Sequence, residues 1–150
     1  GSVVPFFSKL IKEGKKELPL THPEMTRFFI TLPDAVKFVT ERFNFLKGGE
    51  IFIPKMPSIL ISDLIKILDP NIKTKIIGIR PGEKKHETLC SLEEAYYLYE
   101  SKNFFTIYPS TINLKDKIGK KVKNNFAYSS NLKSNLNKNK IKNLLRKTNH

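Results

Sequence analysis

The stretch Thr31–Ile79, TLPDAVKFVTERFNFLKGGEIFIPKMPSILISDLIKILDPNIKTKIIGI, decides the fold class, because helix and strand patterns alternate along it. Thr31 suits the N-cap of a first helix, with Asp34 three residues on, and Gly48-Gly49 suits its end. Between these ends, apolar residues recur at helical spacing, namely Ala35, Val36, Phe38, Val39, Phe43 and Leu46. We therefore predict a helix with an apolar stripe.

Three further elements follow within the same stretch. Glu50–Lys55 alternates as a strand does, Ser58–Leu68 has the pattern of a second capped helix, and Thr74–Ile79 is a β-branched strand. Helices that alternate with short strands predict an α/β arrangement. No glycine-rich turn leads from a strand into a helix, which argues against a complete dinucleotide-binding fold.

The flanks of this stretch add shorter elements. Val3–Lys12 has apolar residues at spacings of three and four, with Pro5 in the first turn, and predicts a short amphipathic helix. Extended segments are predicted at Leu18–Thr21, Met25–Ile30 and Phe104–Tyr108, and a helix at Leu92–Glu100 with Ser91 as its cap.

The net charge of +13 is unevenly distributed along the 150 residues. Residues 111–150 hold 11 Lys and Arg against the single acid Asp116, whereas residues 1–110 are nearly balanced. We therefore predict a folded domain over residues 1–110 and a basic, Lys- and Asn-rich tail over 111–150 that is largely mobile. Within the tail, Ile141, Leu144 and Leu145 predict a weak terminal helix.

The composition also bears on location and on metal binding. Cys90 is the single cysteine, so no disulfide forms within the chain, and a reducing cytoplasmic compartment is expected. No apolar run approaches the roughly 20 residues that cross a bilayer, so we expect no membrane insertion. The three histidines lack a zinc-ligand spacing, and we predict no metal site.

Ile77–Glu87, with the sequence IGIRPGEKKHE, is the most informative segment for chemistry. Arg80 lies at the tip of the predicted strand, Pro81-Gly82 turns the chain, and Glu83 follows three residues after the arginine. A guanidinium offers two parallel donors to a diphosphate, and a carboxylate accepts from a ribose diol. The alternative is a surface Arg–Glu pair beside a tight turn.

Arg27 lies among residues that favour burial, which places it at the rim of a core element. Arg27 and Arg80 together have the charge to clamp the two phosphates of a nucleotide sugar. The alternative is an arginine whose stem packs on the core while its head reaches solvent.

Five ordered motifs carry a family resemblance, namely GSVVPFF at 1–7, LPLT at 18–21, MTRF at 25–28, GGEIFIPK at 48–55 and GIRPGEKKHE at 78–87. Over residues 1–110 the chain resembles the inverting UDP-N-acetylglucosamine 4,6-dehydratases, which belong to the extended short-chain dehydrogenase/reductase superfamily. Even the tail has a similar element, FAYSS at 126–130.

The resemblance implies an α/β fold that is the carboxyl-terminal, substrate-binding part of an NAD(P)-binding Rossmann-like enzyme. It implies that Arg27 and Arg80 hold the diphosphate of UDP-N-acetylglucosamine and that Glu83 holds the uridine ribose. The segments Val3-Val4-Pro5 and Leu18-Pro19-Leu20 would then lie on the uracil side.

The resemblance also implies what the chain lacks. The family's glycine-rich cofactor turn, its Tyr-x-x-x-Lys pair and its acid/base residues lie upstream of the matched region. We therefore expect a missing amino-terminal half that binds NADP, no catalytic residue in this chain, an inactive fragment, and a homo-oligomer when intact. A close epimerase or dehydratase relative remains an alternative, as does a basic nucleic-acid-binding module built on residues 111–150.

Overall fold

The computed structural model describes residues 3–148, which form two compact units. Unit 1 takes the described residues of Gly1–Phe29, Pro57–Glu87 and Ser130–His150, and unit 2 takes Ile30–Met56 and Thr88–Ser129. Each unit is therefore assembled from segments that lie far apart in the sequence. The division into residues 1–110 and 111–150 stays a prediction, and both units draw residues from both ranges.

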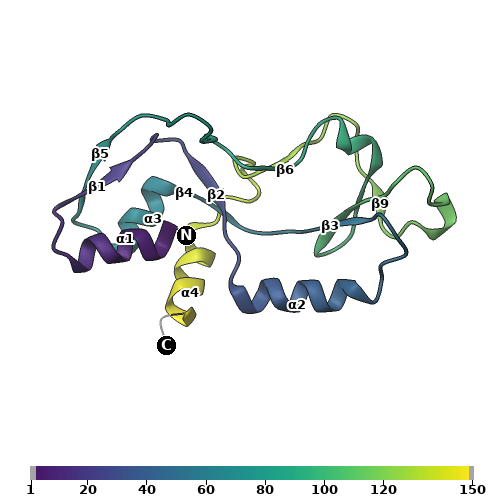
Figure 1. Ribbon diagram of the computed structural model, residues 1–150, viewed down its shortest axis with the longest axis horizontal. Helices are drawn as coiled ribbons and strands as arrows, with labels where there is room; N and C mark the ends of the chain where they lie inside the picture. Colours follow the sequence, from purple (N-terminus) through teal and green to yellow (C-terminus); the bar gives the residue numbers. More distant parts are fainter. Residues whose placement is uncertain (1–2, 149–150) are drawn as a thin grey trace. The chain divides into compact units, whose positions relative to one another are not determined.

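Unit 1 contains three helices and two pairs of strands among the described residues (Figure 1). Its elements are α1 (Val3–Lys12), β1 (Glu17–Leu20), β2 (Thr26–Phe28), β4 (Ser58–Leu60), α3 (Ile61–Leu68), β5 (Lys73–Ile76) and α4 (Lys138–Thr148). β1 pairs in parallel with β5, and β2 pairs antiparallel with β4. The predicted amphipathic helix over residues 3–12 is confirmed.

The core of unit 1 brings the apolar faces of its helices and strands together. The buried members are Phe7, Leu18, Leu20, Met25, Ile59, Ile61, Leu64, Ile65, Ile141 and Leu145. Ile141 and Leu145 come from α4, so the predicted terminal helix forms and its apolar face is part of this core. Burial of such side chains contributes about 1.5–3 kcal/mol each to folding.

Unit 2 is built around a four-stranded antiparallel sheet in the order β3-β8-β7-β9. Its elements are α2 (Leu32–Phe43), β3 (Ile51–Pro54), β6 (Thr88–Cys90), a 3-10 turn (Glu94–Tyr97), β7 (Leu98–Glu100), β8 (Phe104–Ile107), a second 3-10 turn (Leu114–Asp116), β9 (Lys120–Lys121) and β10 (Tyr128–Ser129). β10 pairs antiparallel with β6. Aromatic rings fill the interior, for example Phe105 against Tyr128 and Tyr99 against Tyr108.

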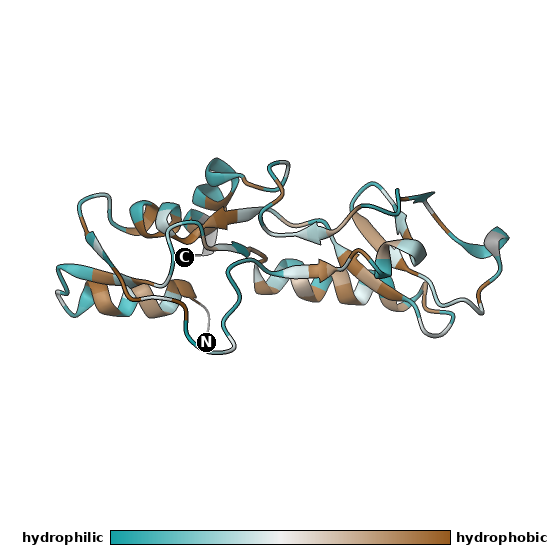
Figure 2. Cartoon of the chain, turned by 90° about the horizontal axis from the view of Figure 1, so that it is seen from above, coloured by the Kyte–Doolittle hydropathy of each residue, from teal (hydrophilic) through white to brown (hydrophobic). Residues whose placement is uncertain are grey.

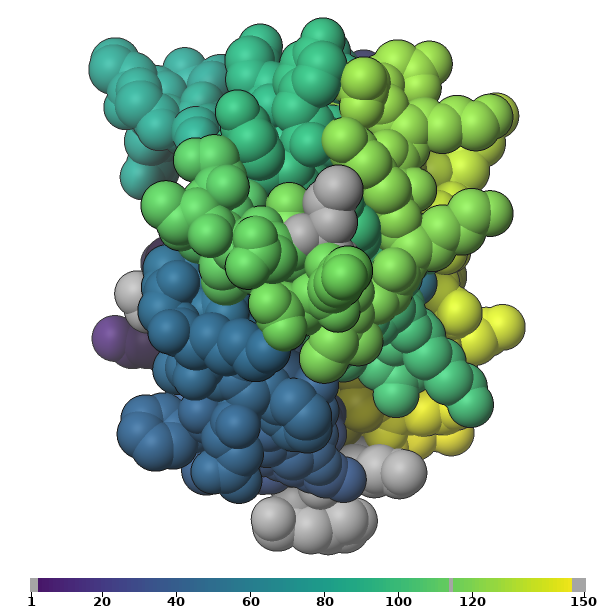
Figure 3. Space-filling view, turned by 90° about the vertical axis from the view of Figure 1, so that its right-hand side faces the viewer, coloured from purple at the N-terminus to yellow at the C-terminus, as the bar shows by residue number. Residues whose placement is uncertain are grey.

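α2 begins as the sequence predicts, since the Asp34 N–H donates to Thr31 Oγ1 at 3.2 Å. No residue of α2 is buried, however. Leu32, Val36, Val39 and Phe43 are 54–78% exposed, and the hydrophobic bands along this helix are visible in Figure 2. In Figure 3 the blue atoms, which include the second half of α2, lie at the surface of unit 2.

Two predicted helices differ from the structure. Ser58 is not a helix cap but a buried strand residue, because β4 pairs with β2 and Ser58 N–H donates to the Asn135 carbonyl. Ser91 Oγ accepts from the Glu94 N–H at 3.3 Å, but Ser91 is not the N-cap, because the helix is a single 3-10 turn, Glu94–Tyr97, with Glu93 at its N-cap and no side-chain cap bond. The turn gives way to β7, since Leu98–Glu100 pairs with β8. β4 pairs with a strand far away in the sequence and β7 pairs with its neighbour in a hairpin, and in both cases strand pairing overrides the local helical pattern.

The predicted α/β class is confirmed. Within residues 3–148, no helix combines the length and the apolar character that a bilayer crossing requires.

Candidate functional site

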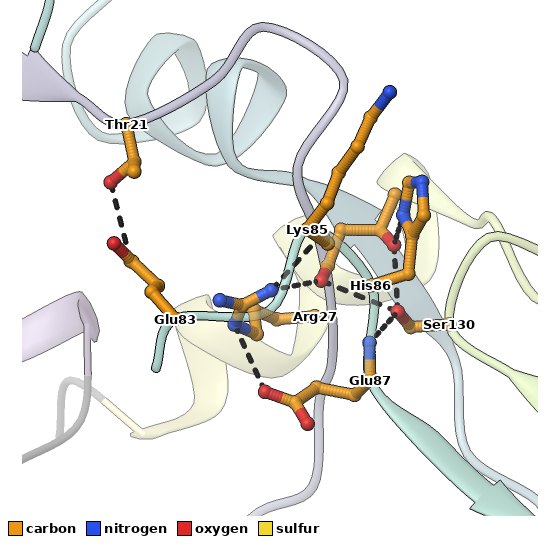
Figure 4. A network of polar contacts seen from close by, with 8 residues as sticks. Thr21, Arg27, Glu83, Lys85, His86, Glu87 and Ser130 are labelled. Atoms are coloured by element: carbon orange, nitrogen blue, oxygen red, sulfur yellow. Dashed lines mark hydrogen bonds and ion pairs between the residues drawn. The ribbon is translucent and has the colours of Figure 1, made fainter. Parts of the chain in front are cut away.

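The turn after β5 is held in shape by its own polar groups. Gly78 and Gly82 have φ of +83° and +79°, which a residue with a side chain rarely adopts. Across Pro81-Gly82 the Glu83 N–H donates to the Arg80 carbonyl at 3.0 Å. The Glu83 carboxylate accepts from the Arg80 N–H at 3.4 Å. It also accepts from Thr21 Oγ1 at 3.3 Å (Figure 4). Glu83 is therefore fixed both to its own turn and to the end of β1.

A cavity of about 560 Å³ lies within unit 1 beside this turn. Arg27, Arg80 and Glu83 all line it, together with Val3 and Pro19. The rest of its wall is Thr21 and the largely apolar set Phe6, Phe7, Met25, Phe28, Ile61 and Ile77. The volume and the mixture of apolar wall with a few polar groups are typical of small-molecule sites.

The other residues of the predicted site lie elsewhere. Leu18 and Leu20 are buried in the core, 0% and 3% exposed, and neither lines the cavity. Val4 packs against the core, and Pro5 is exposed but does not line the cavity. The preceding Gly1-Ser2 of the first motif lies outside the described residues.

Arg27 is held by two backbone carbonyls and one carboxylate. Its Nη1 donates to the Thr26 carbonyl at 2.7 Å and to the Lys85 carbonyl at 3.2 Å. Its Nε lies 3.4 Å from a Glu87 carboxylate oxygen, and only 22% of the side chain is exposed. The head group is thus fixed by the protein, and Nη2 is the guanidinium nitrogen that these contacts leave unused.

Arg80 differs from Arg27 in being exposed. Among the described residues, no ion pair joins its guanidinium to the Glu83 carboxylate, which bonds to the Arg80 backbone instead. The surface Arg–Glu pair that the sequence left open is therefore not what the structure shows. The Arg80 guanidinium is available to an anionic ligand.

A buried polar network lies behind Arg27 (Figure 4). Thr26 Oγ1 is 2.8 Å from His86 Nδ1 and 2.6 Å from Ser130 Oγ, and the Glu87 N–H donates to Ser130 Oγ at 2.9 Å. Burial lowers the pKa of His86, and the neighbouring Lys85 charge lowers it further. No local sequence pattern assigns a role to these residues, although Thr26 adjoins Arg27 and Ser130 ends the FAYSS segment.

Cys90 has the surroundings of a structural cysteine. Cys90 is buried, and burial, followed by the nearby Glu94 charge, raises the pKa of its thiol to about 11. The thiol therefore stays protonated near neutral pH, as a structural cysteine does. In the part of the chain that the structure describes, no group of three or more His, Cys, Asp or Glu residues is placed to hold a metal ion.

The described residues do not fit a dinucleotide cofactor. β4 passes directly into α3 at Leu60–Ile61 without a glycine, and no side chain caps that helix. A dinucleotide site needs glycines at such a junction, because the backbone must approach the pyrophosphate closely. The β4–α3 junction therefore lacks the backbone form that holds a dinucleotide pyrophosphate.

Comparison with known proteins finds similar enzymes that act on nucleotide sugars. The chain is 52% identical over 140 residues to the UDP-N-acetylglucosamine 4,6-dehydratase (inverting) of Campylobacter jejuni subsp. jejuni serotype O:2, covering 87% of this chain and 42% of that protein. It is 40% identical over 111 residues to a UDP-glucose 4-epimerase of Rickettsia massiliae, covering 71% of this chain and 32% of the epimerase. The dehydratase resemblance seen in the sequence motifs is thereby confirmed.

A solved structure and a family model also match this chain. The X-ray structure of Pen from Bacillus thuringiensis matches with a TM-score of 0.81 and 34% identity, over 99% of this chain and 45% of that one. The chain thus spans less than half the length of these relatives. The family model described as polysaccharide biosynthesis protein matches residues 1–109. Because that match covers more than half of the chain, the chain belongs to the polysaccharide biosynthesis protein family.

Proposed function

We propose that this chain is the substrate-binding part of an NADP-dependent UDP-N-acetylglucosamine 4,6-dehydratase that inverts C5 of the sugar. The observation that carries the proposal is that Arg27, Arg80 and Glu83 line one cavity of about 560 Å³. The enzyme would serve nucleotide-sugar and surface-polysaccharide or pseudaminic acid biosynthesis in the cytoplasm.

The chemistry of the three side chains suits a nucleoside diphosphate. Two guanidinium groups at one cavity supply positive charge and directed donors to the two phosphates. Glu83 already accepts from Thr21 and from the Arg80 backbone, and its carboxylate has further lone pairs for ribose hydroxyls. The apolar wall, with Val3 and Pro19, offers a surface for the uracil ring.

The redox chemistry is assigned to an amino-terminal half. We propose that this half binds NADP and carries the residues that oxidise C4, eliminate water across C5 and C6, and return the hydride to C6. The 42% coverage of the dehydratase relative supports the proposal. The exposed apolar face of α2 supports it as well, because a further part of the protein would cover that face. The intact enzyme is proposed to be a homo-oligomer, and the isolated chain to be inactive.

An arginine substitution tests the site. In the intact enzyme, Arg80→Ala should weaken UDP binding about 10- to 100-fold, because it removes charge-assisted donors to a phosphate. Isothermal titration with UDP measures this loss. Lys84→Ala is the matched control, since Lys84 is a basic residue of the same turn that does not line the cavity. Equal affinities for the wild type and Arg80→Ala would remove Arg80 from the site.

The epimerase relative supports a second candidate, a nucleotide-sugar epimerase with the same binding part. The product distinguishes the two activities. A dehydratase converts UDP-N-acetylglucosamine into a 4-keto-6-deoxy sugar nucleotide, whereas an epimerase returns the 4-epimer. Mass spectrometry detects the loss of water that only the dehydratase causes.

A further inference from the structure

Ser130 and Thr26 are buried polar residues that lie far apart in the sequence and contact each other in unit 1. Ser130 is 0% exposed and Thr26 is 2% exposed, and their hydroxyl oxygens are 2.6 Å apart. A buried hydroxyl without a partner is costly, so such a pair is retained where both hydroxyls are bonded. Each of these hydroxyls also has a further partner on the segment that leads away from the Arg80 turn.

Ser130 holds that segment at two points. Its N–H donates to the Glu87 carbonyl at 2.8 Å, and its Oγ accepts from the Glu87 N–H at 2.9 Å. Thr26 holds the two residues that precede Glu87, because its N–H donates to the Lys85 carbonyl at 3.1 Å and its Oγ1 contacts His86 Nδ1 at 2.8 Å. Residues 85–87 are thereby fixed to β2.

The Thr26 and Ser130 hydroxyls have a partner at every contact. Thr26 Oγ1 is within hydrogen-bonding distance of both His86 Nδ1 and Ser130 Oγ, and the His86 tautomer decides which atom of each pair donates. Ser130 Oγ accepts from the Glu87 N–H, and the Thr26 carbonyl at 3.3 Å is a second acceptor for its proton. Every group in this series is satisfied, and such a series is stiffer than separate bonds.

Arg27 is held by Thr26 of β2 and by Lys85 and Glu87 of this segment. Its Nη1 bonds to the carbonyls of Thr26 and Lys85, and its Nε lies beside the Glu87 carboxylate. Any shift of residues 85–87 relative to β2 would therefore move the guanidinium at the cavity wall.

We propose that Ser130 is a positioning residue of the diphosphate site, which fixes Glu87 and Thr26 so that Arg27 presents Nη2 to the ligand. This inference rests on the proposed function. It makes a residue of the basic 111–150 range part of the substrate site, even though Ser130 does not line the cavity.

The test uses UDP and uridine as probes of the intact enzyme. Ser130→Ala should weaken UDP binding roughly fivefold, the effect of about one hydrogen bond, and leave uridine binding unchanged because uridine has no phosphates. Thr26→Val should act like Ser130→Ala, and Thr26→Ser should restore UDP affinity because it keeps the hydroxyl. Ser58→Ala is the control, since Ser58 is as deeply buried in unit 1 but its hydroxyl has no partner.

A double-mutant cycle separates positioning from general stability. In an Arg27→Ala enzyme, Ser130→Ala should cause no further loss of UDP affinity, because the group that it positions is gone. An equal loss in both backgrounds, or a parallel loss of uridine affinity, would overturn the positioning role. If Arg27→Ala itself leaves UDP affinity unchanged, the proposed diphosphate site fails. If Arg27→Ala weakens UDP binding but Ser130→Ala does not, only the role of Ser130 fails. Thermal unfolding of each variant verifies that the enzymes compared are folded.

Discussion

α3 and α2 are both amphipathic helices, but the apolar face of α3 is buried and that of α2 is exposed to solvent. In α3, Leu64 and Ile65 are completely buried in the core of unit 1. In α2, Val39 and Phe43 are 64% and 71% exposed. The comparison teaches that an apolar stripe predicts a helix with a face to cover, but does not say whether the cover belongs to the same stretch of chain.

The two helices also differ in where their partners come from. α3 is covered by α1 and by α4, so its partners lie at both ends of this chain. The residues that the structure describes do not bury any residue of α2. This difference supports the proposal that α2 belongs to a surface that the amino-terminal half covers.

The largest expected change in the free energy of unfolding concerns the buried helix α3. Leu64→Ala should lower the free energy of unfolding by about 2–5 kcal/mol, because it leaves a cavity in a closely packed core. Val39→Ala removes an apolar side chain from α2 and should change the free energy of unfolding by less than about 0.5 kcal/mol. Urea unfolding followed by circular dichroism measures both values. Similar losses for the two variants would mean that α2 is covered after all.

Ile141 tests whether the basic carboxyl-terminal range contributes to stability. Ile141→Ala should lower the free energy of unfolding by about 2–3 kcal/mol, because its side chain is 0% exposed in the core of unit 1. The same urea titration applies, with Lys142→Ala as an exposed control on the same helix. A negligible loss for Ile141→Ala would show that α4 does not dock on the core in solution.

The smallest effect on stability is expected at the exposed face. The double variant Val39→Lys and Phe43→Lys should unfold within about 0.5 kcal/mol of the wild type, since both positions already contact water. Its self-association should decrease, because exposed apolar patches promote aggregation. Sedimentation velocity on the 150-residue chain measures the second effect. Unfolding of this variant at a markedly lower urea concentration would contradict the exposure of α2.

The sequence pointed to the main residues of the candidate site but not to the contacts that hold Arg27 in place. Arg80 and Glu83 were predictable because they flank one Pro-Gly turn, and their spacing alone places them at the same corner. Arg27 was predictable from its apolar neighbours and from the family motif. Their position at a common cavity depends on the parallel pairing of β1 with β5. The contacts of Arg27 with Lys85 and Glu87 depend on long-range bonds that no local pattern encodes.

The sequence by itself determined the α/β class, the cap of α2, the helix at residues 3–12 and the identity of the charged residues. These features depend on spacings of three or four residues and on turn chemistry, which act locally. Only the tertiary structure decided that Ser58 is a strand residue, that Leu18 and Leu20 are core residues, and that Ser130 fixes Glu87. Those outcomes depend on hydrogen bonds and packing between segments tens of residues apart, whose free energy exceeds the small local preferences.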